Sequence, residues 1–136
     1  HPAEIAAVLQ AARAGARGRV IAVVEPHRYT RVRDLFRDFT TCFTAADNVI
    51  VAPMYTAGES PIDGIDQQTL AEGIRAAGHP AVALIDDPRE LVGLIRRHGR
   101  QGDTVILLGA GNSAEGAHAL PGWLAQAEPR RAGSAM

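Results

Sequence analysis

The chain has 136 residues and a formal net charge of −1. That length is enough for one domain with a hydrophobic core, and the near-neutral charge gives no general attraction to nucleic acid or to an acidic membrane surface. All fourteen strongly basic residues are arginines. Without lysine the chain can form neither a Walker-type phosphate loop nor a Schiff base. If the protein uses ATP, another domain must therefore bind the triphosphate.

The single cysteine, Cys42, lies in a helical pattern between Phe39 and Phe43 and is interpreted as a small buried hydrophobic residue. One thiol forms no disulfide within the chain, which suits a reducing cytoplasm. No apolar run approaches the roughly 20 residues that cross a bilayer, and no signal peptide is evident. We therefore expect a cytoplasmic protein that does not contact a membrane. Because the sequence begins His1-Pro2, we also expect it to be part of a longer chain.

Apolar spacing predicts helices and strands in alternation along the chain. In chain order we expect a helix over 2–14, a strand over 19–24, a helix over 31–46, a strand over 48–52, a long loop over 53–64, a helix over 66–77, a strand over 81–85, a helix over 86–98, a strand over 104–108 and a last helix over 113–125. The segment 127–136 is rich in Pro, Gly, Ser and Arg and is expected to be disordered.

The expected strands are continuously apolar rather than alternating, which is typical of a parallel sheet covered on both faces. The sequence therefore predicts a single α/β domain over residues 1–126, with a Rossmann-like, doubly wound, mainly parallel sheet and helices on both faces.

A basic cluster follows the first expected strand and comprises His27, Arg28, Arg31 and Arg33. Ligands of open α/β sheets bind outside the carboxyl ends of the strands, and arginine matches carboxylates and phosphates with two parallel hydrogen bonds. Arg31 also opens a helix, where free N–H groups favour anions. The cluster predicts an anionic ligand. Arg33 and Arg37 fit the alternative, a solvated helix face that pairs with neighbouring aspartates.

Two further segments end at the same edge of the predicted sheet. In the loop over 53–64, Tyr55 could stack or donate a hydrogen bond and Glu59 could orient an arginine. The alternative for both residues is a purely structural role in an ordered loop. The turn that starts at Gly109 fits G-x-G-x-x-A, but the acidic residue of a dinucleotide site has no later strand on which to lie. The turn either lines a ligand crevice or packs a strand closely against a helix, and a nicotinamide oxidoreductase is disfavoured.

With these residues in view, the chain resembles the C-terminal domain of the Mur ligases over residues 1 to about 125. Two motifs carry the resemblance most specifically, Pro26-His27-Arg28-Tyr29-Thr30-Arg31 and Tyr55-x-Ala57-Gly58-Glu59-x-Pro61-Ile62-x-Gly64. The terminal His1-Pro2-Ala3-Glu4-Ile5 and the turn Gly109-Ala110-Gly111-Asn112 add to it.

The resemblance implies an ATP-dependent amide ligase with three domains, of which the N-terminal UDP-sugar domain and the central ATPase domain are absent from this chain. The His-Arg-Tyr run is similar to members that add L-alanine to UDP-N-acetylmuramate in peptidoglycan precursor synthesis. In such an enzyme ATP phosphorylates the muramoyl carboxylate, and the alanine amine attacks the acyl phosphate. ATP and Mg²⁺ would serve the full-length enzyme, this domain alone would bind neither, and the fragment would be inactive.

The resemblance also assigns residues. Arg28 and Arg31 would grip the alanine carboxylate, with His27 and Tyr55 in the same substrate pocket. No main catalytic residue and no metal ligand is expected in this chain. The edge of the nucleotide and reaction centre would comprise His1, Gly109 and Gly111. Two alternatives stay open, a murein peptide recycling ligase domain and a non-catalytic anion-binding module with a Rossmann-like fold.

Overall fold

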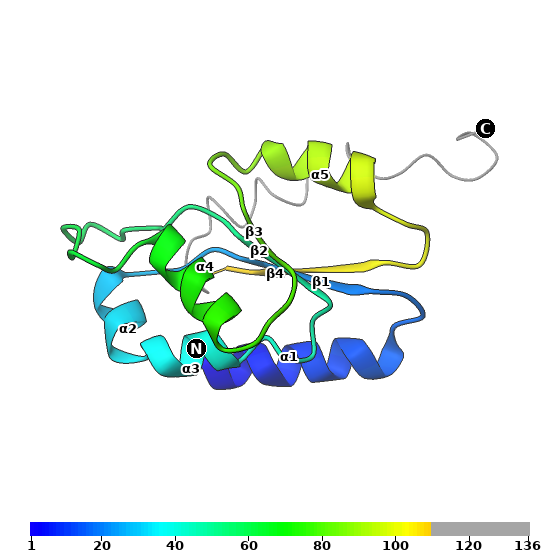
Figure 1. Ribbon diagram of the computed structural model, residues 1–136, viewed down its shortest axis with the longest axis horizontal. Helices are drawn as coiled ribbons and strands as arrows, with labels where there is room; N and C mark the ends of the chain where they lie inside the picture. Colours follow the sequence, from blue (N-terminus) through cyan, green and yellow to red (C-terminus); the bar gives the residue numbers. More distant parts are fainter. Residues whose placement is uncertain (110–136) are drawn as a thin grey trace.

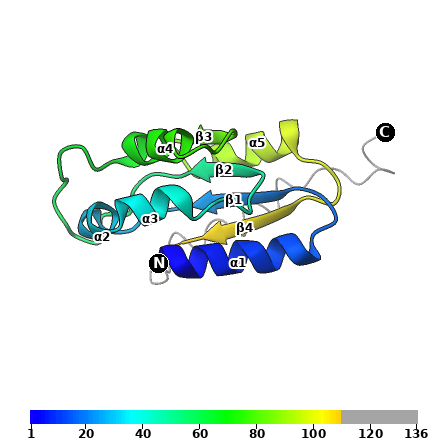
Figure 2. The ribbon, with the colours of Figure 1, turned by 60° about the horizontal axis from the view of Figure 1, so that its bottom comes forward.

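The computed structural model describes residues 1–109, which form an α/β fold around a four-stranded sheet (Figure 1). Within this part of the chain the strands are β1 (Val20–Val24), β2 (Asn48–Val51), β3 (Val82–Leu84) and β4 (Thr104–Leu108). They are all parallel and are ordered β3-β2-β1-β4, as Figure 2 shows from top to bottom. The predicted parallel α/β sheet is confirmed, and each strand lies within one residue of its expected bounds.

Helices cover both faces of the sheet. The helices α1 (Pro2–Gly15), α2 (Tyr29–Asp34), α3 (Phe36–Thr41) and α4 (Gln67–Ala76) pack on one face, whereas α5 (Glu90–His98) packs on the other (Figure 1). Side chains of β1 alternate between the two cores, because successive residues of a strand point to opposite faces. Val20, Ala22 and Val24 join the first core, and Ile21 and Val23 join the second.

The order of the strands places a crevice at the carboxyl end of β1. From β1 the chain moves through α2 and α3 to β2, and then through α4 to β3, on one side. It then passes through α5 to reach β4 on the other side of β1. The register aligns Val24 of β1 with Val51 and with Leu108, so three strands end at the same level. Ligands of doubly wound sheets bind where the winding direction changes in this way.

The helix expected from residue 86 begins later, at Glu90, and the residue before it, Arg89, makes no capping hydrogen bond with its side chain. Two other helices, α1 and α4, begin with a polar cap at or near the expected position. The ring Nδ1 of His1 accepts a hydrogen bond from the Ala3 N–H at 3.2 Å at the start of α1. The Asp66 carboxylate accepts one from the Thr69 N–H at 2.7 Å at the start of α4. Gly78, which follows the end of α4, has a φ of 108°, a conformation that favours glycine.

The prediction of one helix over 31–46 is wrong. Two helices replace it, with a kink at Leu35 (φ −114°, ψ 22°), and the second ends at Thr41. The early end has a local cause, because the hydroxyl groups of Thr40 and Thr41 donate to the Arg37 carbonyl at 2.8 and 3.1 Å and that of Thr44 donates to the Thr41 carbonyl. Such bonds compete with the continuation of a helix.

The expected helix over 113–125 and the expected disordered segment 127–136 lie outside the described residues. Within residues 1–109, no helix is both long enough and apolar enough to cross a membrane.

Candidate functional site

A small cleft lies at the carboxyl ends of β1 and β4, where the topology predicts a ligand site. It has a volume of about 20 Å³, room for roughly one water molecule. Its lining comprises His1, Ile5, Val24, Glu25, Pro26, His27, Arg31, Phe39, Leu108 and Gly109. Four residues singled out by sequence therefore meet here, although they come from the start, the first quarter and the end of the described chain. These are His1, His27, Arg31 and Gly109.

The backbone explains why these segments meet. The Glu25 N–H donates to the Leu108 carbonyl at 2.9 Å and so joins the ends of β1 and β4. His1 reaches the cleft because it caps α1, which packs on β1 and β4. His27 is buried beneath the turn, with 9% of its surface exposed, whereas Arg31 is exposed on the first turn of α2. The cleft thus combines imidazole rings, a carboxylate and one accessible guanidinium group.

Tyr55 reaches this region from the neighbouring loop. It pairs with His27 as a short parallel bridge, in which the Arg28 N–H donates to the Tyr55 carbonyl at 2.9 Å and the Tyr55 N–H donates to the Pro26 carbonyl at 2.8 Å. The two rings are 5.0 Å apart between centroids and tilted by 54°, within the range of favourable aromatic contacts. Tyr55 remains 42% exposed and does not line the cleft itself.

Arg28 occupies a different position from Arg31. It is exposed, is not part of the lining of the cleft, and precedes α2 with a φ of 64° and a ψ of 121°. Few residues other than glycine adopt a positive φ, and one that does must be held by its surroundings. The structure therefore brings Arg31, but not Arg28, to the wall of the cleft.

Within residues 1–109, Glu59 pairs with no arginine at hydrogen-bond distance. Its carboxylate accepts from the Thr30 N–H at 3.1 Å and from the Thr30 hydroxyl at 2.6 Å. These two bonds, the hydroxyl first, lower the pKa of Glu59, and the charge of Arg28 adds to the effect. The expectation that the helix start offers free N–H groups to a ligand therefore needs correction at Thr30, where a carboxylate of the protein already occupies the position.

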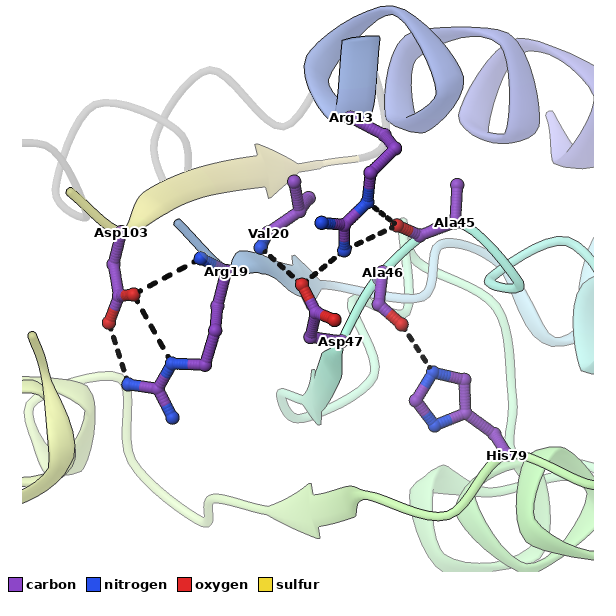
Figure 3. Close-up of polar contacts among 8 residues, drawn as sticks. All are labelled: Arg13, Arg19, Val20, Ala45, Ala46, Asp47, His79 and Asp103. Atoms are coloured by element: carbon purple, nitrogen blue, oxygen red, sulfur yellow. Dashed lines mark hydrogen bonds and ion pairs between the residues drawn. The ribbon is translucent and has the colours of Figure 1, made fainter. Parts of the chain in front are cut away.

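Two of the four salt bridges within residues 1–109 lie at the opposite, amino end of the strands (Figure 3). The Arg19 guanidinium group binds Asp103 with two hydrogen bonds, at 2.6 and 3.2 Å, and the Asp103 side chain is only 7% exposed. Burial opposes ionisation of Asp103, but the bonds from Arg19 and Arg100 still lower its pKa. Asp47 joins Arg13 in a similar pair. These contacts tie strand starts together and lie far from the cleft along the strands.

A larger cavity of about 340 Å³ also lies at the amino ends of the strands, beneath α5. Its walls are mainly apolar and include Ile21, Ile50 and Leu94. Arg19 and His98 also line it. Because it opens at the amino end of a parallel sheet, whereas ligands bind at the carboxyl end, we assign the candidate site to the smaller cleft.

Neither metal nor thiol chemistry is indicated within residues 1–109. No group of three His, Cys, Asp or Glu side chains in this part of the chain could hold a metal ion. Cys42 is buried, as the sequence predicts, and burial raises its pKa to about 12, so it remains a thiol at neutral pH.

Sequence reasoning missed several contributors to the site. Glu25 and Phe39 line the cleft, and the Thr30 hydroxyl donates a hydrogen bond to the Glu59 carboxylate. The position of Glu25 directly after a strand was a usable signal, whereas the contact between Thr30 and Glu59 spans 29 residues and has no local signature. Gly111, the remaining residue of the predicted set, lies outside the described residues.

Comparison with known proteins identifies the class of protein that carries this fold and cleft. Residues 1–111 match the family model of the Mur ligase, glutamate ligase domain, and the chain belongs to this family. The resemblance read from the sequence motifs is therefore confirmed.

Two relatives with the same name are similar to this chain over most of its length. The chain is 56% identical over 124 residues to the UDP-N-acetylmuramate–L-alanine ligase of Azorhizobium caulinodans, a match that covers 91% of this chain and 27% of that protein. It is also 56% identical over 124 residues to the enzyme of the same name from Phenylobacterium zucineum, covering 91% and 26%. The chain thus spans about a quarter of the length of these relatives.

A known structure shares the fold. It is the crystal structure of a domain assigned to a UDP-N-acetylmuramate:L-alanyl-gamma-D-glutamyl-meso-diaminopimelate ligase from Haemophilus ducreyi. The TM-score is 0.56 at 25% sequence identity, and the match covers 90% of this chain and 84% of that one.

Proposed function

We propose that residues 1–126 are the C-terminal domain of a UDP-N-acetylmuramate–L-alanine ligase, which joins L-alanine to UDP-N-acetylmuramate during peptidoglycan precursor synthesis in the cytoplasm. The observation that carries the proposal is the 56% identity to ligases of that name over 124 residues. A match of this kind over almost the whole domain includes the loops at the carboxyl ends of the strands, where α/β proteins bind their ligands.

In this proposal the domain presents the amino acid to a reaction centre built largely by other domains. Arg31 holds the alanine carboxylate by charge-assisted hydrogen bonds, with Arg28, His27 and Tyr55 around it. The free amine then attacks the carbonyl carbon of the muramoyl acyl phosphate, a C–N bond forms and phosphate leaves. Holding the amine close to that carbon supplies much of the rate gain of such a step.

His1, Gly109 and Gly111 are proposed to lie at the edge that meets the nucleotide and the reaction centre. A cleft with room for about one water molecule does not enclose an amino acid, which supports a site completed by a partner domain. ATP and Mg²⁺ are proposed to be bound by the other domains, because this chain has no lysine for a phosphate loop and residues 1–109 contain no cluster of metal ligands.

The second candidate is a ligase that attaches a ready-made peptide, the activity in the name of the Haemophilus ducreyi protein. Its only specific support is the shared fold at 25% identity. The higher identity to the alanine-adding ligases favours L-alanine as the acceptor, and a non-catalytic anion-binding module has no observation of its own in its favour.

The first prediction concerns Arg31. We expect Arg31→Ala in the full-length enzyme to raise the apparent KM for L-alanine by about 10- to 100-fold, the size of one lost hydrogen bond to a charged group, and to lower turnover. The KM for UDP-N-acetylmuramate should hold. Steady-state kinetics with each substrate varied in turn would measure both constants.

Arg33→Ala provides a matched control on the same helix, because Arg33 is exposed and pairs with Asp34 at 2.9 Å away from the cleft. Its kinetics should equal those of the wild type. An apparent KM for L-alanine that Arg31→Ala leaves unchanged would contradict the assignment of this residue. A wild-type enzyme that does not use L-alanine as a substrate but does use a peptide would favour the second candidate.

A further inference from the structure

The proposed function leaves most of the loop over residues 53–64 without a role, although this loop is bound closely to the site. The exchange of backbone hydrogen bonds between Tyr55 and the segment Pro26–Arg28 fixes the start of the loop beside the end of β1. The loop then turns at Ala57 and Gly58, whose φ values are 54° and 84°. This turn directs the next residue, Glu59, back towards α2.

Glu59 supplies a cap that α2 does not have in its own sequence. The residue at the cap position is Arg28, and its side chain makes no capping hydrogen bond. The first N–H groups of a helix need acceptors, which a Ser, Thr, Asp or Asn usually provides from the preceding position. Here the carboxylate of Glu59 accepts from the backbone and the hydroxyl of Thr30 instead, at 3.1 and 2.6 Å.

The capped turn is the one that carries the proposed amino-acid site. Thr30 is the direct neighbour of Arg31, which lines the cleft. On its other side lies the unfavourable backbone conformation of Arg28, with a φ of 64°. Conformations of this kind cost about 1–3 kcal/mol and persist only where surrounding contacts hold them. Glu59 supplies two such contacts, and its negative charge lies close enough to Arg28 for the two to interact.

We propose that Glu59 is a positioning residue for the amino-acid site: by capping α2 from the neighbouring loop, it fixes the first turn of the helix and keeps Arg31 at the wall of the cleft. This inference rests on the proposed function, because Arg31 is the residue through which Glu59 acts. The loop that covers the end of β2 thereby determines the geometry of the site at the end of β1.

The test uses Glu59→Ala, Glu59→Gln and Thr30→Val in the full-length enzyme. We expect Glu59→Ala to raise the apparent KM for L-alanine about fivefold, the effect of losing one helix cap, while the KM values for ATP and UDP-N-acetylmuramate stay unchanged. Glu59→Gln keeps one acceptor oxygen and should show a smaller rise. Thr30→Val removes the same hydroxyl bond, so combining it with Glu59→Ala should raise the KM by less than the product of the two single effects.

Asp63→Asn is the matched control, because Asp63 is an exposed carboxylate of the same loop and its substitution removes the same charge. It should leave all three KM values unchanged. Hydrogen exchange of the peptide that contains residues 29–34 should be faster in Glu59→Ala than in Asp63→Asn, since an uncapped helix turn opens more often.

The possible outcomes separate this inference from the function on which it rests. A selective rise in the KM for L-alanine, together with faster exchange of α2, supports it. An unchanged KM for L-alanine in Glu59→Ala, or an equal change in all three KM values, overturns it even where the wild type adds alanine normally. A wild-type enzyme that does not use L-alanine overturns the proposed function itself and this inference with it.

Discussion

Asp47, just before β2, joins three separate segments of the chain through one side chain. Its carboxylate accepts from the Val20 N–H at 2.7 Å and pairs with Arg13, which also donates to the Ala45 carbonyl (Figure 3). The bond from Val20, and then the pair with Arg13, lower the pKa of Asp47 below its ordinary value of 3.8. The start of β1, the end of α1 and the start of β2 are therefore held in register by one ionised group.

A stability prediction follows at this residue. Because the pKa is lower in the folded chain than in the unfolded chain, the contribution of Asp47 to stability is complete above about pH 5 and is lost as the pH falls through the folded pKa. Asp47→Asn should lower the free energy of unfolding at pH 7 by about 1 kcal/mol, a modest value because the pair is partly exposed. Urea unfolding of the 136-residue chain at several pH values would measure it.

The difference between Asp47→Asn and the wild type should shrink when the pH is lowered below 4 or so. Asp34→Asn is the control, since Asp34 pairs with the adjacent Arg33 on an exposed surface, where such pairs contribute little. An Asp47 effect of equal size at pH 7 and at pH 2 would contradict an electrostatic origin.

Between elements, α4 packs closely against α3 at Gly73. A Cβ atom added to Gly73 of α4 would lie 2.7 Å from Cγ2 of Thr40 and 3.0 Å from Cζ of Phe36. Real Cβ atoms do not approach other atoms so closely, and Thr40 is buried. Gly73 is therefore required by the distance between two helices rather than by its own backbone conformation.

Two glycine substitutions separate these effects. Alanine in a helix interior is more favourable than glycine by about 1 kcal/mol, and Gly93→Ala in α5 should show this gain, because the added Cβ meets only the flexible guanidinium group of Arg97, at 3.2 Å. Gly73→Ala should instead lower the free energy of unfolding by about 1 kcal/mol, because overpacking outweighs the gain. Chemical denaturation of both variants would measure the two changes in the free energy of unfolding. Equal stabilisation by the two substitutions would contradict the close packing of α3 on α4.

The structure divides the predicted helix 31–46 between the two helices α2 and α3. The hydrophobic spacing of Leu35, Phe36, Phe39 and Phe43 indicated a helix. Phe39 and Phe43 are buried in one core, and Leu35 and Phe36 are half-buried against it. Hydrogen bonds from the Leu35 N–H to the Arg31 carbonyl and from the Phe39 N–H to the Leu35 carbonyl continue across the kink. The periodic signal therefore identified the buried face correctly but could not locate a bend that leaves that face intact.

For the whole molecule, the proposed binding of ATP by the other domains leads to a direct prediction. The purified 136-residue chain should hydrolyse no ATP in the presence of Mg²⁺, L-alanine and UDP-N-acetylmuramate, because it has no lysine with which to hold a triphosphate in a phosphate loop. Phosphate release can be measured with the full-length enzyme as the positive control. Turnover by the purified chain at a rate near that of the full-length enzyme would refute the proposed assignment of ATP to the other domains.

The edge of the sheet that carries the site could be predicted, but its internal arrangement could not. The basic cluster after the first strand indicated an anion site at a strand end, and His27 and Arg31 do line a cleft there. That Arg28 lies outside the cleft lining, and that Glu59 occupies the start of α2, depend on contacts between two loops. Such contacts leave no periodic pattern in either segment.

The amino-acid sequence by itself determined the class of fold, the bounds of the strands and the family, because continuous apolar runs and short motifs are local properties that survive in any arrangement of the chain. Only the tertiary structure decided the strand order β3-β2-β1-β4, the meeting of His1 with Gly109, and the cap that one loop gives to the helix of another. These features depend on contacts between residues far apart in sequence, whose free energies are realised only when the sheet and both of its covering layers have formed.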